Sequence, residues 1–211
     1  MNKKILEFAN RNMALDNSEK QLMIQEAASA YEKFMDALRI DWRNDPNSSD
    51  TPNRVAKSFV NDLISGCYSD PPNITSFDNV DSYNGIVFSG RIDLNSMCSH
   101  HHLTFYGHAY VAYIPSEHGK IIGLSKLNRI VEWFSRRPQV QENLTTQIHN
   151  YIDQFTQENQ GVAVLISAKH LCACVRGVKH NSNMVTSKLS GAFFDNQSTK
   201  DEFYKFIDYS K

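Results

Sequence analysis

Two groups of cysteine and histidine, far apart in the sequence, have the residue types of a metal site. Cys98 and His101 are three residues apart, a spacing that lets both side chains reach one ion from a turn, and Cys172 follows much later in the chain. Thiolate and imidazole both suit zinc, and three protein ligands leave a fourth position for water, as in catalytic zinc sites. We therefore expect Cys98, His101 and Cys172 to bind zinc.

Two further histidines, His100 and His170, adjoin these ligands in the sequence. Imidazole titrates near neutral pH, so each can act as a general acid or base towards a water molecule at the open position. The alternative is a structural zinc with four protein ligands. His100, His102 or Cys174 would then supply the fourth ligand, and spacing alone leaves both possibilities open.

Several cationic side chains stand near the starts of expected helices. Lys126 and Arg129 are i, i+3 neighbours just after Ser125, which is placed to cap a helix. Free backbone N–H groups and two cations make an anion site there, although a solvated basic face is the simpler alternative. Arg54 and Lys57 have the same i, i+3 spacing near the start of another expected helix, and Arg176 lies on the expected strand face that carries His170 and Cys172. Together with a metal, these cations suggest a polyphosphate substrate.

Glu142 follows Gln141 near another expected helix start. A carboxylate at this position can accept hydrogen bonds from a guanine-like pair of N–H groups. It can equally be a first-turn residue that the helix dipole favours. The sequence alone leaves the choice between these two readings of Glu142 open.

Helical periodicity recurs in several segments that have recognisable start signals. Ser18 and Gln21 form a capping-box pattern, and Pro52 suits the first turn of a helix that Gly66 would end. We expect helices that begin near Ser18, Thr51, Ser125, Pro138 and Asp201.

Strand-like alternation occupies the segments between these helices. Residues 86–94 are expected to form a strand with Ile86, Phe88, Ile92 and Leu94 on one face, and residues 108–114 to form its partner. A third strand over 162–176 would place His170, Cys172, Cys174 and Arg176 on a single face. Helices, strands, helices and strands in this order indicate an α+β fold.

The composition excludes several classes of protein. The 211 residues carry a net charge of −1, so no basic field favours nucleic acid, and no apolar run approaches the roughly 20 residues that a membrane helix needs. The N-terminal residues lack the apolar stretch of a secretory signal. Four cysteines in such a chain do not make a disulfide scaffold. We expect a cytoplasmic protein with reduced thiols.

Several co-linear motifs together resemble GTP cyclohydrolase I. Thr51–Lys57 looks like the entry helix of that family, and the resemblance extends from about Asp45 to Phe206. The segments that carry it are Cys98–His101, Gly123–Val131, Arg136–Glu142 and His170–Gly177. Because several motifs occur in the family's order, the resemblance is specific.

The resemblance implies a fold, an activity and an assembly. The fold is the tunnelling fold, an antiparallel sheet backed by two helices, at residues 71–211, after an N-terminal helical region at 1–70. The activity is the zinc-dependent conversion of GTP and water to 7,8-dihydroneopterin triphosphate and formate. The assembly is a homodecamer of two pentamers, with active sites between subunits.

The resemblance also implies a role for each matching residue. Cys98, His101 and Cys172 would bind zinc, and His100 and His170 would transfer protons. Glu142, with Gln141, would hold the guanine. The triphosphate would be held by Ser125, Lys126, Arg129 and Arg176, with Arg54 and Lys57 as further candidates.

The chain departs from the family pattern at Ser99, where the family usually has Glu. Residues around metal ligands orient them, so this change can reduce or retune activity. It motivates the alternative of a non-catalytic or altered-specificity protein that binds a purine or pterin on the same fold. A third class, the nucleobase deaminases, is disfavoured because their His-x-Glu and Pro-Cys-x-x-Cys signature is absent.

Overall fold

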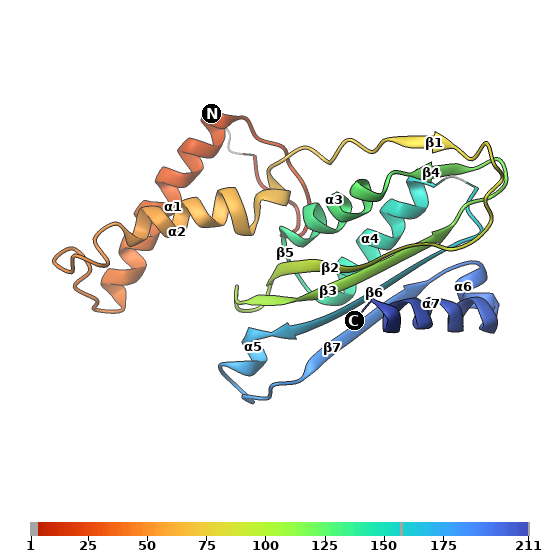
Figure 1. The fold of residues 1–211 in the computed structure, drawn as a ribbon. Helices are drawn as coiled ribbons and strands as arrows, with labels where there is room; N and C mark the ends of the chain where they lie inside the picture. Colours follow the sequence, from red (N-terminus) through yellow and green to blue (C-terminus); the bar gives the residue numbers. More distant parts are fainter. Residues whose placement is uncertain (1–3, 157, 211) are drawn as a thin grey trace. The chain divides into compact units, whose positions relative to one another are not determined.

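The computed structural model describes residues 4–156 and 158–210, and it divides the chain into two units, Met1–Asp70 and Pro71–Lys211. The first unit contains the helices α1 (Asn17–Ala37) and α2 (Thr51–Ser58). The second unit contains a twisted sheet with helices on both faces (Figure 1). The predicted α+β class is confirmed.

Helix α1 is capped by Asp16 rather than by Ser18, so the predicted capping box was wrong by two residues. The Asp16 carboxylate accepts from the Glu19 backbone N–H at 2.8 Å, and the Glu19 carboxylate accepts from the Asp16 N–H at 3.0 Å. Ser18 lies in the first turn and donates its hydroxyl to Asp16. A carboxylate is a stronger acceptor than a hydroxyl or an amide, which favours the Asp16–Glu19 pair over Ser18–Gln21.

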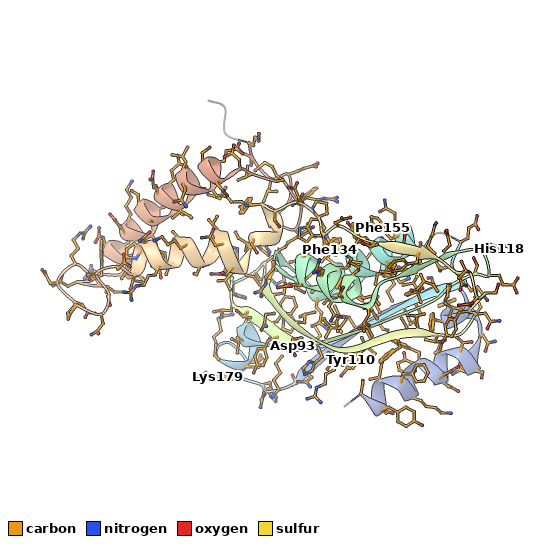
Figure 2. All side chains as sticks on the ribbon, turned by 45° about the horizontal axis from the view of Figure 1, so that its top comes forward. Asp93, Tyr110, His118, Phe134, Phe155 and Lys179 are labelled. Atoms are coloured by element: carbon orange, nitrogen blue, oxygen red, sulfur yellow. The ribbon has the colours of Figure 1, made fainter. Side chains whose placement is uncertain are left out.

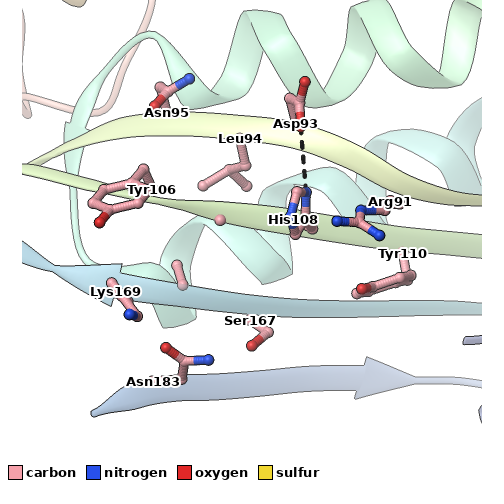
Figure 3. Close-up of a pocket in the computed structure, with 12 residues that line it drawn as sticks. Arg91, Asp93, Leu94, Asn95, Tyr106, His108, Tyr110, Ser167, Lys169 and Asn183 are labelled. Atoms are coloured by element: carbon pink, nitrogen blue, oxygen red, sulfur yellow. Dashed lines mark ion pairs between the residues drawn. The ribbon is translucent and has the colours of Figure 1, made fainter. Parts of the chain in front are cut away.

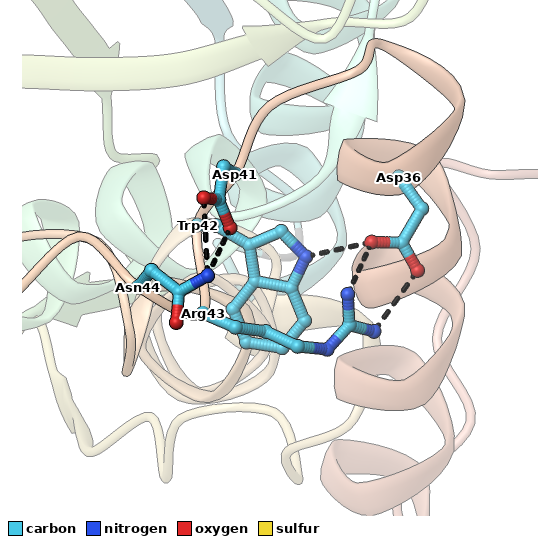
Figure 4. A network of polar contacts seen from close by, with 5 residues as sticks. All are labelled: Asp36, Asp41, Trp42, Arg43 and Asn44. Atoms are coloured by element: carbon cyan, nitrogen blue, oxygen red, sulfur yellow. Dashed lines mark hydrogen bonds and ion pairs between the residues drawn. The ribbon is translucent and has the colours of Figure 1, made fainter.

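The end of α1 is tied to the following loop by the network around Asp36 (Figure 4). Asp36 accepts from the Trp42 indole at 3.0 Å and from both terminal nitrogens of Arg43, at 2.6 and 3.0 Å. The hydrogen bonds from Arg43 and Trp42 lower the pKa of the Asp36 carboxyl. Helix α2 starts at Thr51 as predicted and continues as a π-helical turn, Phe59–Leu63, and a 3-10 turn, Ser65–Cys67, which contains Gly66.

The main sheet of the second unit has the strand order β5-β2-β3-β6-β7. All neighbouring pairs are antiparallel except β2 and β5. The strands are β2 (Val87–Cys98), β3 (Thr104–Ile114), β5 (Pro138–Gln139), β6 (Gly161–His170) and β7 (Asn183–Leu189). A separate two-stranded sheet pairs β1 (Ser76–Asp78) with β4 (Lys120–Ile122).

Helices cover the two faces of this sheet unequally. Helices α3 (Leu124–Ser135) and α4 (Gln141–Phe155) lie on one face and bury the larger core, while α6 (Ala192–Asp195) and α7 (Gln197–Tyr209) pack on part of the other. Figure 2 shows Phe134 and Phe155 beside α3 and α4, and Tyr110 on the opposite side of the sheet. The C-terminal helix was predicted at 201–207 and is longer at both ends.

A bulge in β2 changes which residues share a face. Ser89 pairs with Val111 and Ile92 with Ala109, so β2 has one extra residue there, and Arg91 adopts a φ of 53°. Because a one-residue shift exchanges the faces of a strand, Phe88 packs on the α7 side while Ile92 joins the core under α3 and α4. The prediction that residues 86–94 present one apolar face was therefore wrong.

Two other boundaries differ from the prediction. Strand β6 stops at His170, which pairs with Phe105 of β3, and the chain continues as a helical turn, α5 (Leu171–Cys174). Pro138 does not start a helix: it pairs with Met97 in β5, and α4 begins at Gln141. Among the described residues no helix is both long and apolar enough to cross a membrane.

Candidate functional site

Cys98, His101 and Cys172 meet at one end of the sheet. Cys98 is the last residue of β2, and a tight turn follows in which the His102 N–H donates to the Cys98 carbonyl at 2.9 Å. His102 takes a φ of 53° to close this turn, which returns His101 to Cys98. Cys172 comes from α5, directly after β6. The ligand atoms of the three residues lie within 4.8 Å of one another.

This donor set suits zinc. Two sulfur ligands of one zinc ion are at most about 4.6 Å apart, twice the Zn–S distance, so only a small contraction separates this arrangement from a bound one. Cys98 is buried, Cys172 is half-buried and His101 is exposed, so the group opens from the core towards solvent. Burial raises the pKa of the Cys172 thiol, and its hydrogen bond and charge interaction with Cys98 raise it further.

Arg176 lies beside these ligands on the loop after α5. Its Nη1 is 2.8 Å from His101 Nε2, and a guanidinium can only donate, so this ring nitrogen presents its lone pair. The positive charge of Arg176 also opposes the rise in the pKa of Cys172. The sequence expectation placed Arg176 near the ligands on a shared strand face; the helical turn α5 brings it there instead.

His170 is held in a fixed orientation by two neighbours. Its ring stacks on Phe105, with centroids 4.6 Å apart and planes 6° from parallel. Its Nε2 lies 2.9 Å from Gln141 Oε1. Burial lowers the pKa of His170, and the charge of Glu142 opposes this shift. Phe105 was missed in the sequence, although it alternates with the buried Ala109 and would have been found had the strand been extended backwards.

The two neighbours at the start of α4 have opposite environments. Glu142 is exposed and its charge reaches His170, whereas Gln141 is 1% exposed and both ends of its amide contact protein groups. His100 is exposed, and its ring lies edge-on to that of His101 at 6.4 Å. Of the two residues expected to hold the guanine, Glu142 is thus accessible and Gln141 is not; His100, expected to transfer protons, is accessible as well.

The cations expected to bind triphosphate do not gather at the metal ligands within one chain. Helix α3 begins at Leu124 after Gly123, so Ser125 lies inside the first turn and is not the cap that the sequence predicted. Asn128 in α3 contacts Ser89, nine residues before Cys98 in β2, which corresponds to roughly 30 Å of extended strand. Ser125 and Lys126 therefore lie at the other end of the sheet from the metal ligands (Figure 1).

Arg129 projects from the same exposed part of α3, one turn further on. Arg54 and Lys57 belong to α2 in the N-terminal unit, where both are exposed and Arg54 pairs with Asp50 at 3.1 Å.

A separate hollow lies on the sheet face opposite α3 and α4 (Figure 3). Polar side chains of β2, β3 and β6 line it, including Asp93 and His108, whose Oδ1 and Nδ1 atoms are 3.3 Å apart. The structure describes all the site residues expected from the sequence, and none of them lines this hollow.

Comparison with known proteins decides the family. The sequence model described as GTP cyclohydrolase I matches residues 27–208. The chain belongs to the GTP cyclohydrolase I family. Its curled, mostly antiparallel sheet with α3 and α4 on one face is consistent with the tunnelling fold of that family.

Individual relatives carry the same name. GTP cyclohydrolase 1 of Wigglesworthia glossinidia brevipalpis is 44% identical over 86% of this chain and 83% of its own length. The protein of that name from Chlorobium chlorochromatii is 50% identical over 74% of this chain and 70% of its own. That of Yersinia enterocolitica is 39% identical over 96% and 90%. A solved structure, the archaeosine synthase QueF-Like in the apo form, has a TM-score of only 0.36 at 15% identity, over 49% of this chain and 93% of that one.

Proposed function

We propose that this chain is a zinc-dependent GTP cyclohydrolase I that converts GTP and water to 7,8-dihydroneopterin triphosphate and formate. Its membership of the family and the shared name of its relatives support the reaction. The observation that carries the proposal is the convergence of Cys98, His101 and Cys172 within 4.8 Å. The relatives favour catalysis over the alternative of a protein that only binds a purine or pterin.

The metal is assigned from the chemistry of its donors. Two thiols and one imidazole suit a borderline-soft ion, and three protein ligands leave a position for a reactant. Zinc held by these residues would supply Lewis-acid activation of water at neutral pH. A ligand turn that opens to solvent at His101 gives the reactant access.

Two histidines would move protons beside that centre. His170 is half-buried, and burial disfavours its charged form, so its neutral ring is available as a base. His100 is exposed next to His101 and can exchange protons with solvent. We assign general acid and base roles to His170 and His100.

Charged groups around the centre match the parts of GTP. The exposed carboxylate of Glu142, next to His170, can accept two N–H groups from the guanine edge. Arg176, beside His101, can pair with a phosphate or with the ribose end of the substrate. The remaining triphosphate ligands would be Ser125, Lys126 and Arg129, with Arg54 and Lys57 as further candidates.

These triphosphate ligands argue for a homo-oligomer. Since α3 presents Ser125 and Lys126 at the far end of the sheet from Cys98, a site that uses both ends needs the α3 of a second chain. We propose that the chain works as such an oligomer, a decamer of two pentamers by resemblance to the family, and in the cytoplasm.

The proposal is tested with Cys172→Ser. We expect the variant to fold, to lose stoichiometric zinc and to lose turnover of GTP, measured as formate and, after oxidation, as neopterin fluorescence. Cys174→Ser is the matched control, because Cys174 lies in the same helical turn but outside the ligand set. It should keep both zinc and activity.

Three outcomes would contradict this assignment. A folded and fully active Cys172→Ser protein would remove the zinc centre from the mechanism. Loss of zinc in Cys174→Ser would indicate a structural site with four protein ligands. GTP binding by the zinc-loaded wild-type protein without formate release would favour the binding protein that Ser99 suggested.

A further inference from the structure

Gln141 is a buried polar residue whose position the proposed chemistry does not explain. It is the first residue of α4, it is 1% exposed, and its amide has hydrogen-bond partners at both ends. A side chain that contacts a substrate must reach the site, whereas this one is enclosed by β6 and β7. Its partners show what it does instead.

The nitrogen end of the Gln141 amide faces acceptors only. Nε2 donates to the carbonyl oxygens of Ile166 and Met184, both at 3.1 Å, and to the Thr186 hydroxyl at 3.0 Å. Turning the amide over would place its oxygen against the two carbonyl oxygens, which can only accept, and would leave both of these carbonyls without the amide donor, which is costly. The observed orientation is therefore the stable one.

Two threonines order the protons of this network. Thr145 donates its hydroxyl to the Gln141 backbone carbonyl at 2.8 Å, and its oxygen lies 2.6 Å from that of Thr186. Each hydroxyl has one proton, so Thr186 must donate to Thr145. A lone pair of the Thr186 oxygen then accepts from Gln141 Nε2. The hydrogen bonds thus form a closed cycle: the Gln141 amide donates to Thr186, Thr186 to Thr145, and Thr145 to the Gln141 backbone carbonyl.

The orientation of the amide determines the tautomer of His170. Gln141 Oε1 faces His170 Nε2 at 2.9 Å and can only accept, so Nε2 carries the proton of the neutral ring. The lone pair is then on Nδ1. Phe105, stacked on the ring and buried, prevents the imidazole from tilting out of this arrangement.

We propose that Gln141 is a positioning residue that holds His170 in the Nε2–H tautomer and so makes Nδ1 the atom that exchanges protons with the substrate. Gln141 does not hold the guanine. This inference rests on the proposed role of His170 in proton transfer. The conclusion differs from the role that the family resemblance implied, because the start of α4 at Gln141 turns this side chain into the core and leaves Glu142 outside.

The first test compares Gln141→Met with Glu142→Gln in the zinc-loaded protein. Met has nearly the same shape as Gln and forms no such hydrogen bonds. We expect kcat to fall by about 10- to 100-fold, within the range that an oriented acid–base group contributes, while KM for GTP changes little. The ratio of kcat/KM for GTP to that for inosine triphosphate, which lacks the 2-amino group, should stay at the wild-type value.

Glu142→Gln is the matched control, because it is the next residue of the same helical turn and is exposed. It should raise KM for GTP and reduce discrimination against inosine triphosphate. If Gln141→Met instead raised KM and lost this discrimination, Gln141 would be a guanine ligand and the inference would be wrong.

Two further measurements cover a Gln141 variant that fails to fold. Thr186→Val keeps the shape of the side chain and removes one hydrogen-bond acceptor of Gln141. We expect kcat to fall less than in Gln141→Met, with KM unchanged. A wild-type kcat in this variant would count against the hydrogen-bonded cycle of Gln141, Thr186 and Thr145. Magic-angle-spinning NMR of 15N-histidine-labelled wild-type protein, with His170 assigned by His170→Asn, should find the proton on Nε2. A proton on Nδ1 would overturn the inference, whereas absence of GTP turnover in the wild type would overturn only the proposed function.

Discussion

His149 is a buried histidine away from the metal ligands. It is 4% exposed, its Nε2 lies 2.9 Å from the Ser190 hydroxyl, and its Nδ1 lies 3.3 Å from Asn150 Oδ1. Burial lowers the pKa of His149 below its ordinary value, and the charge of Lys188 lowers it further, while Asn150 and Asp153 oppose the shift. The folded protein therefore contains the neutral ring at neutral pH.

This shift predicts a loss of stability in mild acid. Below about pH 6.5, His149 is protonated in the unfolded chain but still neutral in the folded chain, because its pKa is lower there. The free energy of unfolding therefore falls as the pH falls below about 6.5. Urea denaturation between about pH 7.5 and pH 5.5 measures the slope. In His149→Gln, which keeps hydrogen-bonding capacity without titrating, the slope should be shallower. An unchanged slope would assign it to other groups.

Single residues differ in how far their sequence context identifies them. The convergence of Cys98, His101 and Cys172 could be expected because few other uses explain these types together. The environments of Gln141 and Glu142 could not be expected from the sequence, because they depend on the residue at which α4 begins. A helix that started at Pro138, as predicted, would turn the pair differently from one that starts at Gln141.

At the scale of elements, helix α7 is the main cover of the second sheet face. Phe203 on α7 is fully buried and meets Phe193 and Phe88 in edge-on contacts, with centroids 5.7 and 6.1 Å away. Removal of its ring leaves a cavity between helix and sheet. This side of the core depends on a few aromatic residues, unlike the larger core under α3 and α4.

We expect Phe203→Ala to lower the free energy of unfolding by about 3–5 kcal/mol, the usual cost of a buried phenylalanine. Urea denaturation followed by circular dichroism measures it. Tyr209→Ala serves as the control, because Tyr209 lies in the same helix but is 83% exposed, and it should change stability little. Equal effects of the two changes would mean that α7 is not packed as described.

The periodicity of the sequence predicts which segments form helices and which form strands. It does not predict where these elements end or which face of a strand each residue occupies. The bulge at Arg91 exchanges the faces of β2; Gly90 inside the strand pattern is its local signal, but the unbroken alternation of apolar residues around it points to a regular strand. Strand β6 ends at His170, its last residue paired with β3, although the residues after it keep the alternation of a strand. Pro138 was read as a helix start, although a proline equally suits the first residue of an edge strand.

At the scale of the whole molecule, the functional groups of one chain lie at two ends of one sheet. The metal ligands stand where β2 turns into β3, and the start of α3 lies near the opposite end, beside β4. The order of helices and strands predicts the α+β class, but only the folded geometry reveals this separation. If both groups belong to one site, as proposed, a second chain must supply α3, and no single motif indicates this.

Mixed oligomers test that requirement. Chains with Cys172→Ser and chains with Lys126→Ala should each be inactive, yet their co-assembly should restore part of the GTP turnover, because some sites then combine an intact metal centre with an intact α3. Co-assembly of Cys98→Ser chains with Cys172→Ser chains should restore no turnover. Each chain supplies all three ligands of its own metal centre, so every centre in this mixture lacks one cysteine. Recovery in neither mixture would argue for a site completed within one chain.

The two-residue strand β5 fixes a distance along the backbone. Gln139 is paired with Cys98, and Gln141, two residues on, contacts His170. One stretch of backbone thus sets the spacing between Cys98, a proposed metal ligand, and Gln141, which is proposed to orient His170. A residue inserted between Gln139 and Gln141 would leave the ligand turn paired and move the amide away from the imidazole. We therefore expect such an insertion to remove proton transfer while metal binding is kept, which would turn an enzyme into a metal-loaded binding protein.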